Sequence, residues 1–285
     1  IWDAEVGLQR IQDEGVNFMM GATPFLADLT ECPNLPRYDI STFQIFIAGG
    51  APIPRALVPR ATERLQAHIV SAWGMTEDLI VTTTRLDDPP EKVFGTDGVP
   101  IEGMQIRVVD AAGQVLGVDQ EGELQSRGPA QFVGYLKRPE RYDTDEEGWF
   151  KTGDLARIDA DGYVRITGRA KDIIIRGGEN VPVVEIEQLL HQHPAIQTAV
   201  VVGVPDARLG ERAAAYVILR PGQSLTLDEM KRFLAAQQMA KQYWPEFLAV
   251  AEDLPRTPSG KIQKFRLREL ARTEFAPQQA SGANN

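Results

Sequence analysis

The first hundred residues alternate short apolar runs with a segment of helical periodicity. Residues 16–20 and 43–48 are mostly apolar runs of strand length. Residues 55–65 repeat apolar side chains at every fourth position, which predicts one buried face of a helix. Residues 68–72 are again strand-like, and strand, helix, strand in this order predicts a right-handed parallel crossover in an α/β sheet.

From Gly95 the pattern changes to short alternating segments separated by turn signals. The turn signals are Ala112-Gly113 and Asp161-Gly162. The predicted strands cover residues 105–110, 122–127, 155–159 and 163–167. Together they predict a small antiparallel, barrel-like unit.

Helical periodicity returns after Gly168. Pro182 suits the first helical position, and apolar residues at 183, 186 and 190 form one face of the predicted helix. Strands are predicted at residues 199–204 and 213–219. Thr226 and Glu229 then form a capping box that starts another helix. This part predicts a compact α+β domain.

A chain of 285 residues exceeds the usual size of one domain, about 100 to 200 residues. We expect residues 1–93 to be the C-terminal part of a large α/β domain with a parallel sheet. Residues 94–167 are expected to form the barrel-like subdomain, and residues 168–285 a mobile α+β C-terminal domain. Residues 278–285 are small and polar, and we expect them to be disordered.

Composition excludes several classes of protein. Apolar residues make up 43% and charged residues 25%, as in soluble globular proteins. A net charge of −10 argues against nucleic acid as a partner. A single cysteine, Cys32, excludes an intrachain disulfide and, with three histidines, argues against structural zinc. No apolar stretch approaches the length of about 18 residues that spans a bilayer, and no secretion signal is visible. A cytoplasmic protein without a transmembrane segment is expected.

Two motifs follow predicted strands of the parallel sheet. They are Gly49-Gly50-Ala51 and Trp73-Gly74-Met75-Thr76-Glu77. In open α/β sheets, ligands bind beyond the carboxyl ends of the strands, so this edge is the first candidate site. The alternative is that the glycines only make tight turns.

Further motifs occupy the run from Gly148 to Glu187, which includes Thr152-Gly153-Asp154 and Gly168-Arg169-Ala170-Lys171-Asp172. With the motifs above and the closing segment Pro255 to Ile262, their order resembles the AMP-forming acyl-CoA synthetases of the adenylate-forming superfamily. The resemblance extends from about residue 10 to 272 and covers the C-terminal half of such enzymes. In that family, an acid and ATP give an acyl adenylate and pyrophosphate. A thiol, usually that of coenzyme A, then displaces AMP.

The resemblance implies that one group of residues binds ATP and AMP. Thr76 would contact phosphate and Glu77 would hold Mg²⁺, which makes both catalytic. A carboxylate suits Mg²⁺ because this cation prefers oxygen ligands. Asp154 would accept hydrogen bonds from both ribose hydroxyls. The segments near the adenine would comprise Gly49, Gly50, Ala51, Trp73, Gly74 and Met75.

The resemblance also assigns roles after residue 168. Arg169 would reach the ribose or phosphate, and Lys171 would be the hinge residue. Gly177 and Gly178 would line the path of the coenzyme A arm. Lys261 would contact ATP and catalyse adenylation, because a compact ammonium stabilises the charge that shifts between carboxylate and α-phosphate.

Each residue also has a simpler interpretation. Glu77 alone is a solvated acid in a loop, and Lys171 alone is an exposed charge in a linker. Glu185 and Glu187 suit the positive end of a helix dipole and are interpreted as structural. The basic residues around Lys261 form a solvated tail or meet coenzyme A phosphates.

Relatives hold the β- and γ-phosphates with a Ser/Thr/Gly-rich loop that this sequence does not contain. We therefore expect a fragment of a longer polypeptide, inactive by itself. Two alternatives stay open: an adenylation domain that loads a carrier protein, and a noncatalytic nucleotide-binding relative. The carboxylic acid that is activated and the formation of homo-oligomers also stay open.

Overall fold

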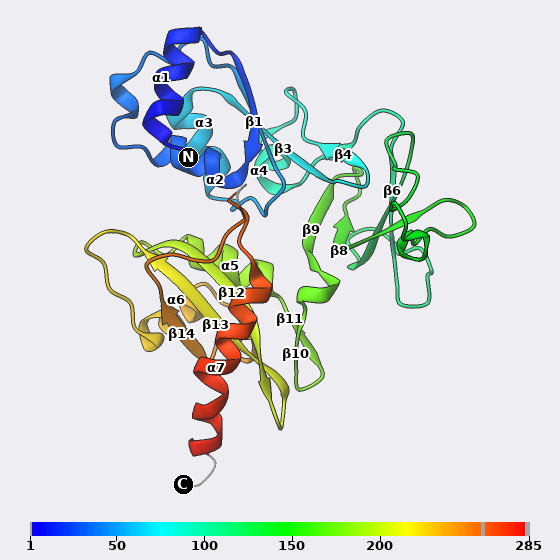
Figure 1. Ribbon diagram of the computed structural model, residues 1–285, viewed down its shortest axis with the longest axis vertical. Helices are drawn as coiled ribbons and strands as arrows, with labels where there is room; N and C mark the ends of the chain where they lie inside the picture. The colour runs from blue at the N-terminus through cyan, green and yellow to red at the C-terminus, as the bar shows by residue number, and fades with distance from the viewer. Residues whose placement is uncertain (1, 258–259, 283–285) are drawn as a thin grey trace. The chain divides into compact units, whose positions relative to one another are not determined.

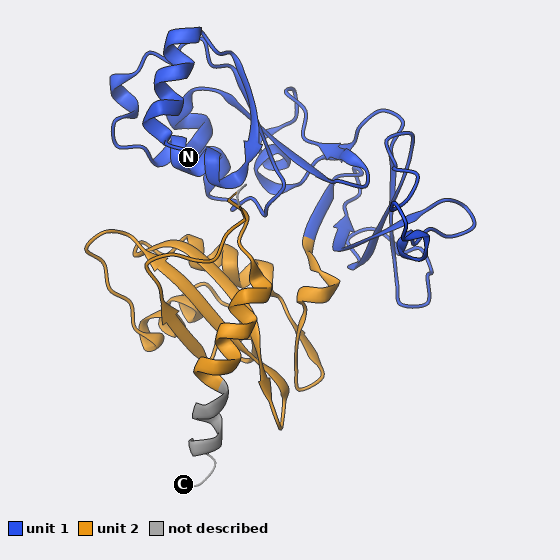
Figure 2. Ribbon diagram, in the orientation of Figure 1, with its two compact units in different colours: residues 1–166 blue, residues 167–285 orange. Residues whose placement is uncertain are grey.

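The computed structural model describes residues 2–257 and 260–282. Two compact units make up the chain, residues 1–166 and 167–285 (Figure 2). Pro258 and Ser259 of the closing motif lie outside the described residues. Within the described ranges, no helix combines the length and apolar character that crossing a membrane requires.

The first sheet of unit 1 is parallel on one side and antiparallel on the other (Figure 1). Helix α3 (Leu57–Leu65) connects two parallel strands, so the predicted parallel crossover is confirmed. The two antiparallel strands at one end of this sheet, residues 79–83 and 99–100, were not predicted from the sequence pattern. In order across the sheet, the strands are β1 (Phe18–Ala22), β2 (Ile45–Gly49), β3 (His68–Met75), β4 (Leu79–Thr83) and β5 (Val99–Pro100).

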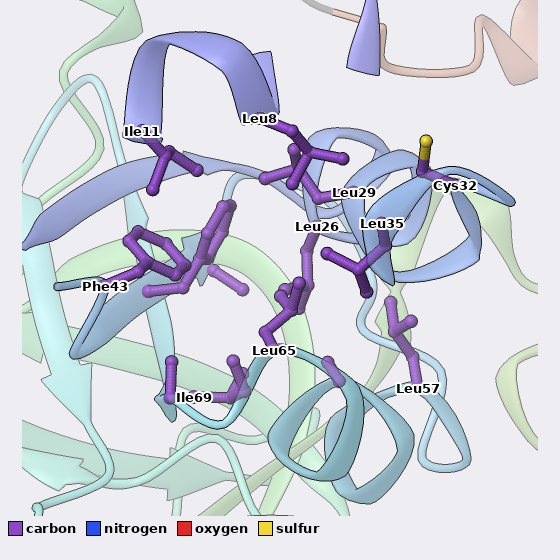
Figure 3. Close-up of a cluster of buried hydrophobic side chains, with 14 of the residues drawn as sticks. Leu8, Ile11, Leu26, Leu29, Cys32, Leu35, Phe43, Leu57, Leu65 and Ile69 are labelled. Carbon is purple, nitrogen blue, oxygen red and sulfur yellow. The ribbon is translucent and has the colours of Figure 1, made fainter. Parts of the chain in front are cut away.

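Leucine side chains from three helices form the core beside this sheet. Helices α1 (Ala4–Glu14) and α2 (Thr23–Glu31) pack with α3, and Figure 3 shows their apolar side chains gathered in one cluster. Leu8, Leu26 and Leu65 are completely buried. Burying one such side chain contributes about 1.5 to 3 kcal/mol. The short helix α4 (Pro90–Gly95) adds partly buried residues to the same core.

The second sheet has four strands, β6 (Gln105–Val109), β7 (Gly122–Arg127), β8 (Phe150–Ile158) and β9 (Val164–Arg169), and the boundary between the two units falls within β9, after residue 166. Among the described residues it is an open sheet with β6 and β9 at its edges, so the predicted barrel-like unit is not a closed barrel. Trp73 and Val81 of the first sheet share a core with Leu124 and Val164 of the second.

A β-bulge interrupts each of these sheets at a glycine-containing motif. One bulge separates Trp73 from Gly74 in the pairing of β3 with β4. The other lies opposite Glu123 and Gln125, where β8 contains Gly153 with a φ of +71°. A bulge bends the strand and changes the direction of nearby side chains. The sheet geometry therefore changes at Trp73 and again near Asp154.

Unit 2 is a sheet between two helical layers. Helices α5 (Val183–His191) and α6 (Leu227–Ala236) cover one face, and helix α7 (Lys264–Gly282) covers the other. Successive residues of one strand face alternate layers, so Val201 packs with α5 and Val200 with α7. The strands are β11 (Glu179–Val181), β10 (Ile174–Arg176), β13 (Gly210–Leu219) and β12 (Ile196–Asp206), with β14 (Phe247–Val250) also on β13.

Helix ends in unit 2 follow capping rules. Thr226 and Glu229 form both hydrogen bonds of the predicted capping box at the start of α6. Pro182, which was predicted as the first helical residue, is instead the N-cap of α5, so the helix begins one position later, at Val183. Helix α7 continues to Gly282 and therefore includes the first residues of the segment expected to be disordered. Residues 283–285 lie outside the described residues.

The carboxylate of Glu187 joins three elements of unit 2. From helix α5, its Oε1 accepts hydrogen bonds from the Val201 backbone N–H of β12 and from Lys264 Nζ of α7, both at 2.7 Å. Strand β12 is an edge of the sheet, so this bond satisfies a backbone donor that has no neighbouring strand. These two hydrogen bonds support the interpretation of Glu187 as a structural residue.

Replacing Glu187 with alanine should lower the unfolding free energy of unit 2 by about 3 kcal/mol, because hydrogen bonds to charged groups contribute about 1.5 to 3 kcal/mol each. Hydrogen exchange of β12 peptides measures this unit directly. The exposed Glu185→Ala is the control, with an expected loss below about 1 kcal/mol for its dipole interaction. Equal losses in both variants would contradict the bridging role of Glu187.

Gly74 and Gly153 lie beside the two bulges, and replacing each with alanine should lower the free energy of unfolding by different amounts. A Cβ at residue 74 would lie 1.8 Å from the Leu79 carbonyl oxygen, whereas a Cβ at residue 153 has no atom within 4 Å. Gly74→Ala should cost at least about 4 kcal/mol, as severe conflicts do. Gly153→Ala should cost about 1 to 2 kcal/mol for its left-handed backbone. Urea denaturation followed by tryptophan fluorescence compares them, and similar losses would disprove the steric argument.

Candidate functional site

A buried hydrogen bond brings two of the predicted motifs together in unit 1. The Nε1–H of Trp73 donates to Oδ2 of Asp154 at 2.9 Å, across 81 positions of sequence. Both side chains are at least nine-tenths buried. The bond lies beside both register shifts, one in the pairing of the Trp73 strand with β4 and the other along the stretch of β8 that contains Asp154.

Asp154 is also held through its backbone. Its N–H donates to the Thr152 hydroxyl at 3.1 Å, and that hydroxyl donates to the Leu124 carbonyl of β7 at 2.6 Å. An ionised carboxylate is an acceptor with two oxygens, the type of group that suits a vicinal diol. The ribose role of Asp154 stays a prediction.

Glu77 lies in the tight turn between β3 and β4, next to the exposed Thr76. Its Oε1 accepts a hydrogen bond from the Tyr135 hydroxyl at 2.5 Å. Its backbone carbonyl accepts one from the Phe132 N–H at 2.7 Å. The bond to Glu77 raises the pKa of Tyr135, because a phenolate would lie beside a carboxylate. Tyr135 was not predicted as a site residue, because it belongs to none of the motifs quoted from the sequence.

Asp78, which was also not predicted from the sequence, is the next residue of the same turn. It is completely buried, and the Ser126 hydroxyl of β7 donates to its Oδ2. Burial raises the pKa of Asp78, and the bond from Ser126 opposes that effect. No periodicity distinguishes this aspartate from a loop acid. It links the Thr76-Glu77 turn to the second sheet.

The segment Gly49-Gly50-Ala51 follows β2. A Cβ at Gly49 would lie 2.9 Å from the Ala72 carbonyl oxygen, and Gly50 has a φ of +73°. The Thr23 hydroxyl donates to the Ala51 carbonyl at 3.1 Å. The glycines are thus required by the adjacent strand and the turn, and their proximity to adenine stays a prediction.

The predicted hinge lies in unit 2. Arg169 is the last residue of β9, and the exposed Lys171 lies in a short 3₁₀ turn over Ala170–Asp172. Arg268 of α7 donates to the Lys171 carbonyl at 3.1 Å and to the Asp172 carboxylate at 2.7 Å. The turn is therefore attached to α7.

Gly177 and Gly178 form the two-residue turn between β10 and β11. Their φ angles are +62° and +90°, and positive values at both positions are typical of the turns that connect tight hairpins. A Gly-Gly pair between two short β-type runs is a hairpin signal that the sequence interpretation did not use. The hairpin explains the glycines locally, and their coenzyme A role stays a prediction.

Lys261 is exposed and follows Gly260, which has a φ of +82°. Its N–H donates to the Thr257 hydroxyl at 3.1 Å, and its carbonyl accepts from the Thr257 N–H at 2.8 Å. Arg256 donates to the Gly260 carbonyl at 3.1 Å. These bonds link Arg256 and Thr257 to Gly260 and Lys261.

The donor set limits what metal the site can hold. Across the described ranges, no group of three or more His, Cys, Asp or Glu side chains could hold a metal ion. Magnesium commonly takes only one or two protein carboxylates, and water and phosphate oxygens complete its coordination. The Glu77 carboxylate fits an ion that arrives with a nucleotide.

Comparison with known proteins agrees with the motifs. The sequence model described as AMP-binding enzyme matches residues 2–136, and the model of the AMP-binding enzyme C-terminal domain matches residues 185–261. A medium-chain fatty-acid–CoA ligase of Escherichia coli (strain K12) is 44% identical over 272 residues, which are 94% of this chain and 48% of that protein.

A second relative, a 3-[(3aS,4S,7aS)-7a-methyl-1,5-dioxo-octahydro-1H-inden-4-yl]propanoyl:CoA ligase of Rhodococcus jostii (strain RHA1), is 36% identical over 94% of this chain and 51% of its own length. The crystal structure of ATP-bound MatB from Rhodopseudomonas palustris superposes with a TM-score of 0.87 at 32% identity, over 94% of this chain and 53% of that chain. The chain thus spans about half the length of these relatives. It belongs to the AMP-binding enzyme family, within the adenylate-forming superfamily.

Proposed function

We propose that this chain carries the nucleotide-binding residues of an AMP-forming acid–thiol ligase that joins a carboxylic acid to coenzyme A. The observation that carries the proposal is the buried bond between Trp73 and Asp154, which brings two family motifs together from two different sheets. The matched family and the names of the relatives support the same activity.

The proposed reaction has two steps. A carboxylate oxygen of the acid attacks the α-phosphorus of ATP, the bond from that phosphorus to the bridging oxygen breaks, and pyrophosphate leaves. The coenzyme A thiol then loses its proton to solvent, its sulfur attacks the acyl carbon, the bond from that carbon to the phosphate oxygen breaks, and AMP leaves. Neither step requires a protein nucleophile, so the protein contributes position and charge.

Nucleotide binding is assigned to side chains that suit it chemically. The Asp154 carboxylate would accept from the ribose hydroxyls, and Arg169 would donate to ribose or phosphate oxygens. The Thr76 hydroxyl would contact phosphate, and Glu77 would hold Mg²⁺. A bound Mg²⁺ ion would neutralise charge on the phosphates. Gly49, Gly50, Ala51, Gly74 and Met75 would lie beside the adenine.

Two elements of unit 2 would serve the two steps separately. Lys261 would place its ammonium beside the carboxylate and α-phosphate during adenylation. The hairpin of Gly177 and Gly178 would leave room for the coenzyme A arm during thioester formation. Lys171 would be the hinge residue between the two steps, and because its side chain is exposed, a change in its φ angle would disrupt no buried side-chain packing.

The class of acid is proposed from the relatives. Their names specify a medium-chain fatty acid and an alicyclic propanoic acid, so we propose an acid with an extended or alicyclic apolar body. A panel of alkyl, alicyclic and aromatic acids tests this with the full-length protein. We expect acid-dependent release of pyrophosphate and a thioester that forms only with coenzyme A. Release of ADP, or transfer only to a carrier protein, would refute the proposal.

Lys261→Ala in the full-length protein should slow adenylate formation by about a thousandfold. An ion pair at about 4 Å and an effective dielectric constant near 20 contributes about 4 kcal/mol, and each 1.4 kcal/mol is about a tenfold change in rate. Thioester formation from a supplied acyl adenylate should change little. Rapid-quench assays of each step measure both rates, with the exposed Arg266→Ala as a nearby control. Equal slowing of the two steps by Lys261→Ala would contradict a role of Lys261 that is specific to adenylation.

A further inference from the structure

One loop of unit 1 holds Glu77 by both its side chain and its backbone. The loop covers residues 128–142, between β7 and β8. Tyr135 donates its hydroxyl to Glu77 Oε1 at 2.5 Å, and the Phe132 N–H donates to the Glu77 carbonyl at 2.7 Å. The two bonds reach Glu77 from residues only three positions apart. The direction of this carboxylate therefore depends on the conformation of the loop.

The loop is itself held by aromatic packing. The Phe132 ring makes edge-on contacts with Tyr135 at 4.8 Å, Tyr142 at 5.0 Å and Phe150 at 5.6 Å between centroids. Phe150 is buried at the start of β8, the strand that carries Asp154. Such pairs contribute about 0.5 to 1.5 kcal/mol each beyond the area they bury. The loop thus connects Glu77 to the strand of Asp154.

Backbone geometry then directs Tyr135 toward Glu77. Gly134 has a φ of +127°, a value that residues with a side chain rarely adopt. The Tyr135 carbonyl accepts from the Arg138 N–H at 3.0 Å, which closes a turn after it. The neighbours Val133 and Leu136 are almost fully exposed, so they do not hold this part of the loop in place. Tyr135 is the residue of this segment that turns back to the protein.

We propose that Tyr135 is a positioning residue that orients the Glu77 carboxylate for the divalent cation of a metal–nucleotide complex. The inference rests on the proposed function, because it takes Glu77 as the metal ligand. Glu77 is only partly buried and its long side chain has many rotamers. The bond from Tyr135 to Oε1 restricts those rotamers, so less conformational entropy is lost when the other oxygen, Oε2, meets the ion.

Tyr135→Phe removes one oxygen atom and keeps the ring that packs on Phe132. Removing a group that orients a metal ligand typically weakens metal binding by about 10- to 100-fold. Because Tyr135 and Glu77 are partly exposed, we expect a loss of about tenfold in Mn²⁺ affinity. Mn²⁺ binding to the full-length protein with ATP, followed by electron paramagnetic resonance, measures the affinity. The affinity for AMP without metal should stay unchanged, which separates a loss of metal orientation from a general loss of the nucleotide site.

Tyr142→Phe is the matched control, because Tyr142 belongs to the same aromatic cluster but its hydroxyl accepts from Gln131. It should bind Mn²⁺ like the parent protein. Glu77→Gln provides the reference for the ligand itself. If Glu77→Gln weakens Mn²⁺ binding and Tyr135→Phe stays within twofold of the parent, the inference is overturned and the proposed function is not. If Glu77→Gln has no effect, the metal role of Glu77 fails, and the role of Tyr135 with it.

Discussion

The bond between the Trp73 indole and the Asp154 carboxylate is the constraint around which unit 1 is arranged. It buries a carboxylate, which is costly unless hydrogen bonds compensate for lost water. Trp73 and Asp154 meet from different sheets, so the bond also links the two sheets of this unit. The bulge after Trp73 and the bulge around Gly153 accompany that arrangement. Beside these shifts, Gly74 leaves no room for a Cβ against the Leu79 carbonyl oxygen, and Gly153 has a left-handed backbone that favours glycine.

The sheet around the site was largely predictable, because its strands and helices carry strong periodic signals. Residues 55–65 repeat apolar side chains at helical spacing, and the parallel crossover around them was predicted correctly. The Thr226 capping box was also predicted, because two side chains at a fixed spacing define it. Strand β4 was missed because it follows the motif turn without a Gly or Pro boundary. Strand β12 was predicted several residues too short, because pairing with β13 extends it beyond its apolar run.

The candidate site also contains some residues that were predicted from the sequence and others that were not. Asp154 and Glu77 were identified by a resemblance of motifs, which names residue types but gives no partners. Tyr135 and Asp78 could not be found by pattern, because their roles depend on contacts between segments far apart in the chain. Tyr135 reaches Glu77 across 58 positions, and Ser126 reaches Asp78 across 48. No local periodicity encodes such a distance. The side chains that hold the motif residues in place therefore emerge only from the fold.

The attachment of the 3₁₀ turn to α7 narrows what a hinge at Lys171 would have to do. Arg268 holds the Lys171 carbonyl and the Asp172 carboxylate, so the peptide that joins these two residues belongs with α7. Rotation after Lys171 would break a charge-assisted hydrogen bond, which costs about 1.5 to 3 kcal/mol. Rotation before the Lys171 carbonyl, at its φ angle and in the preceding residues, would preserve the bond. A pivot in this segment is therefore least costly on the N-terminal side of the Lys171 carbonyl, where the chain leaves β9.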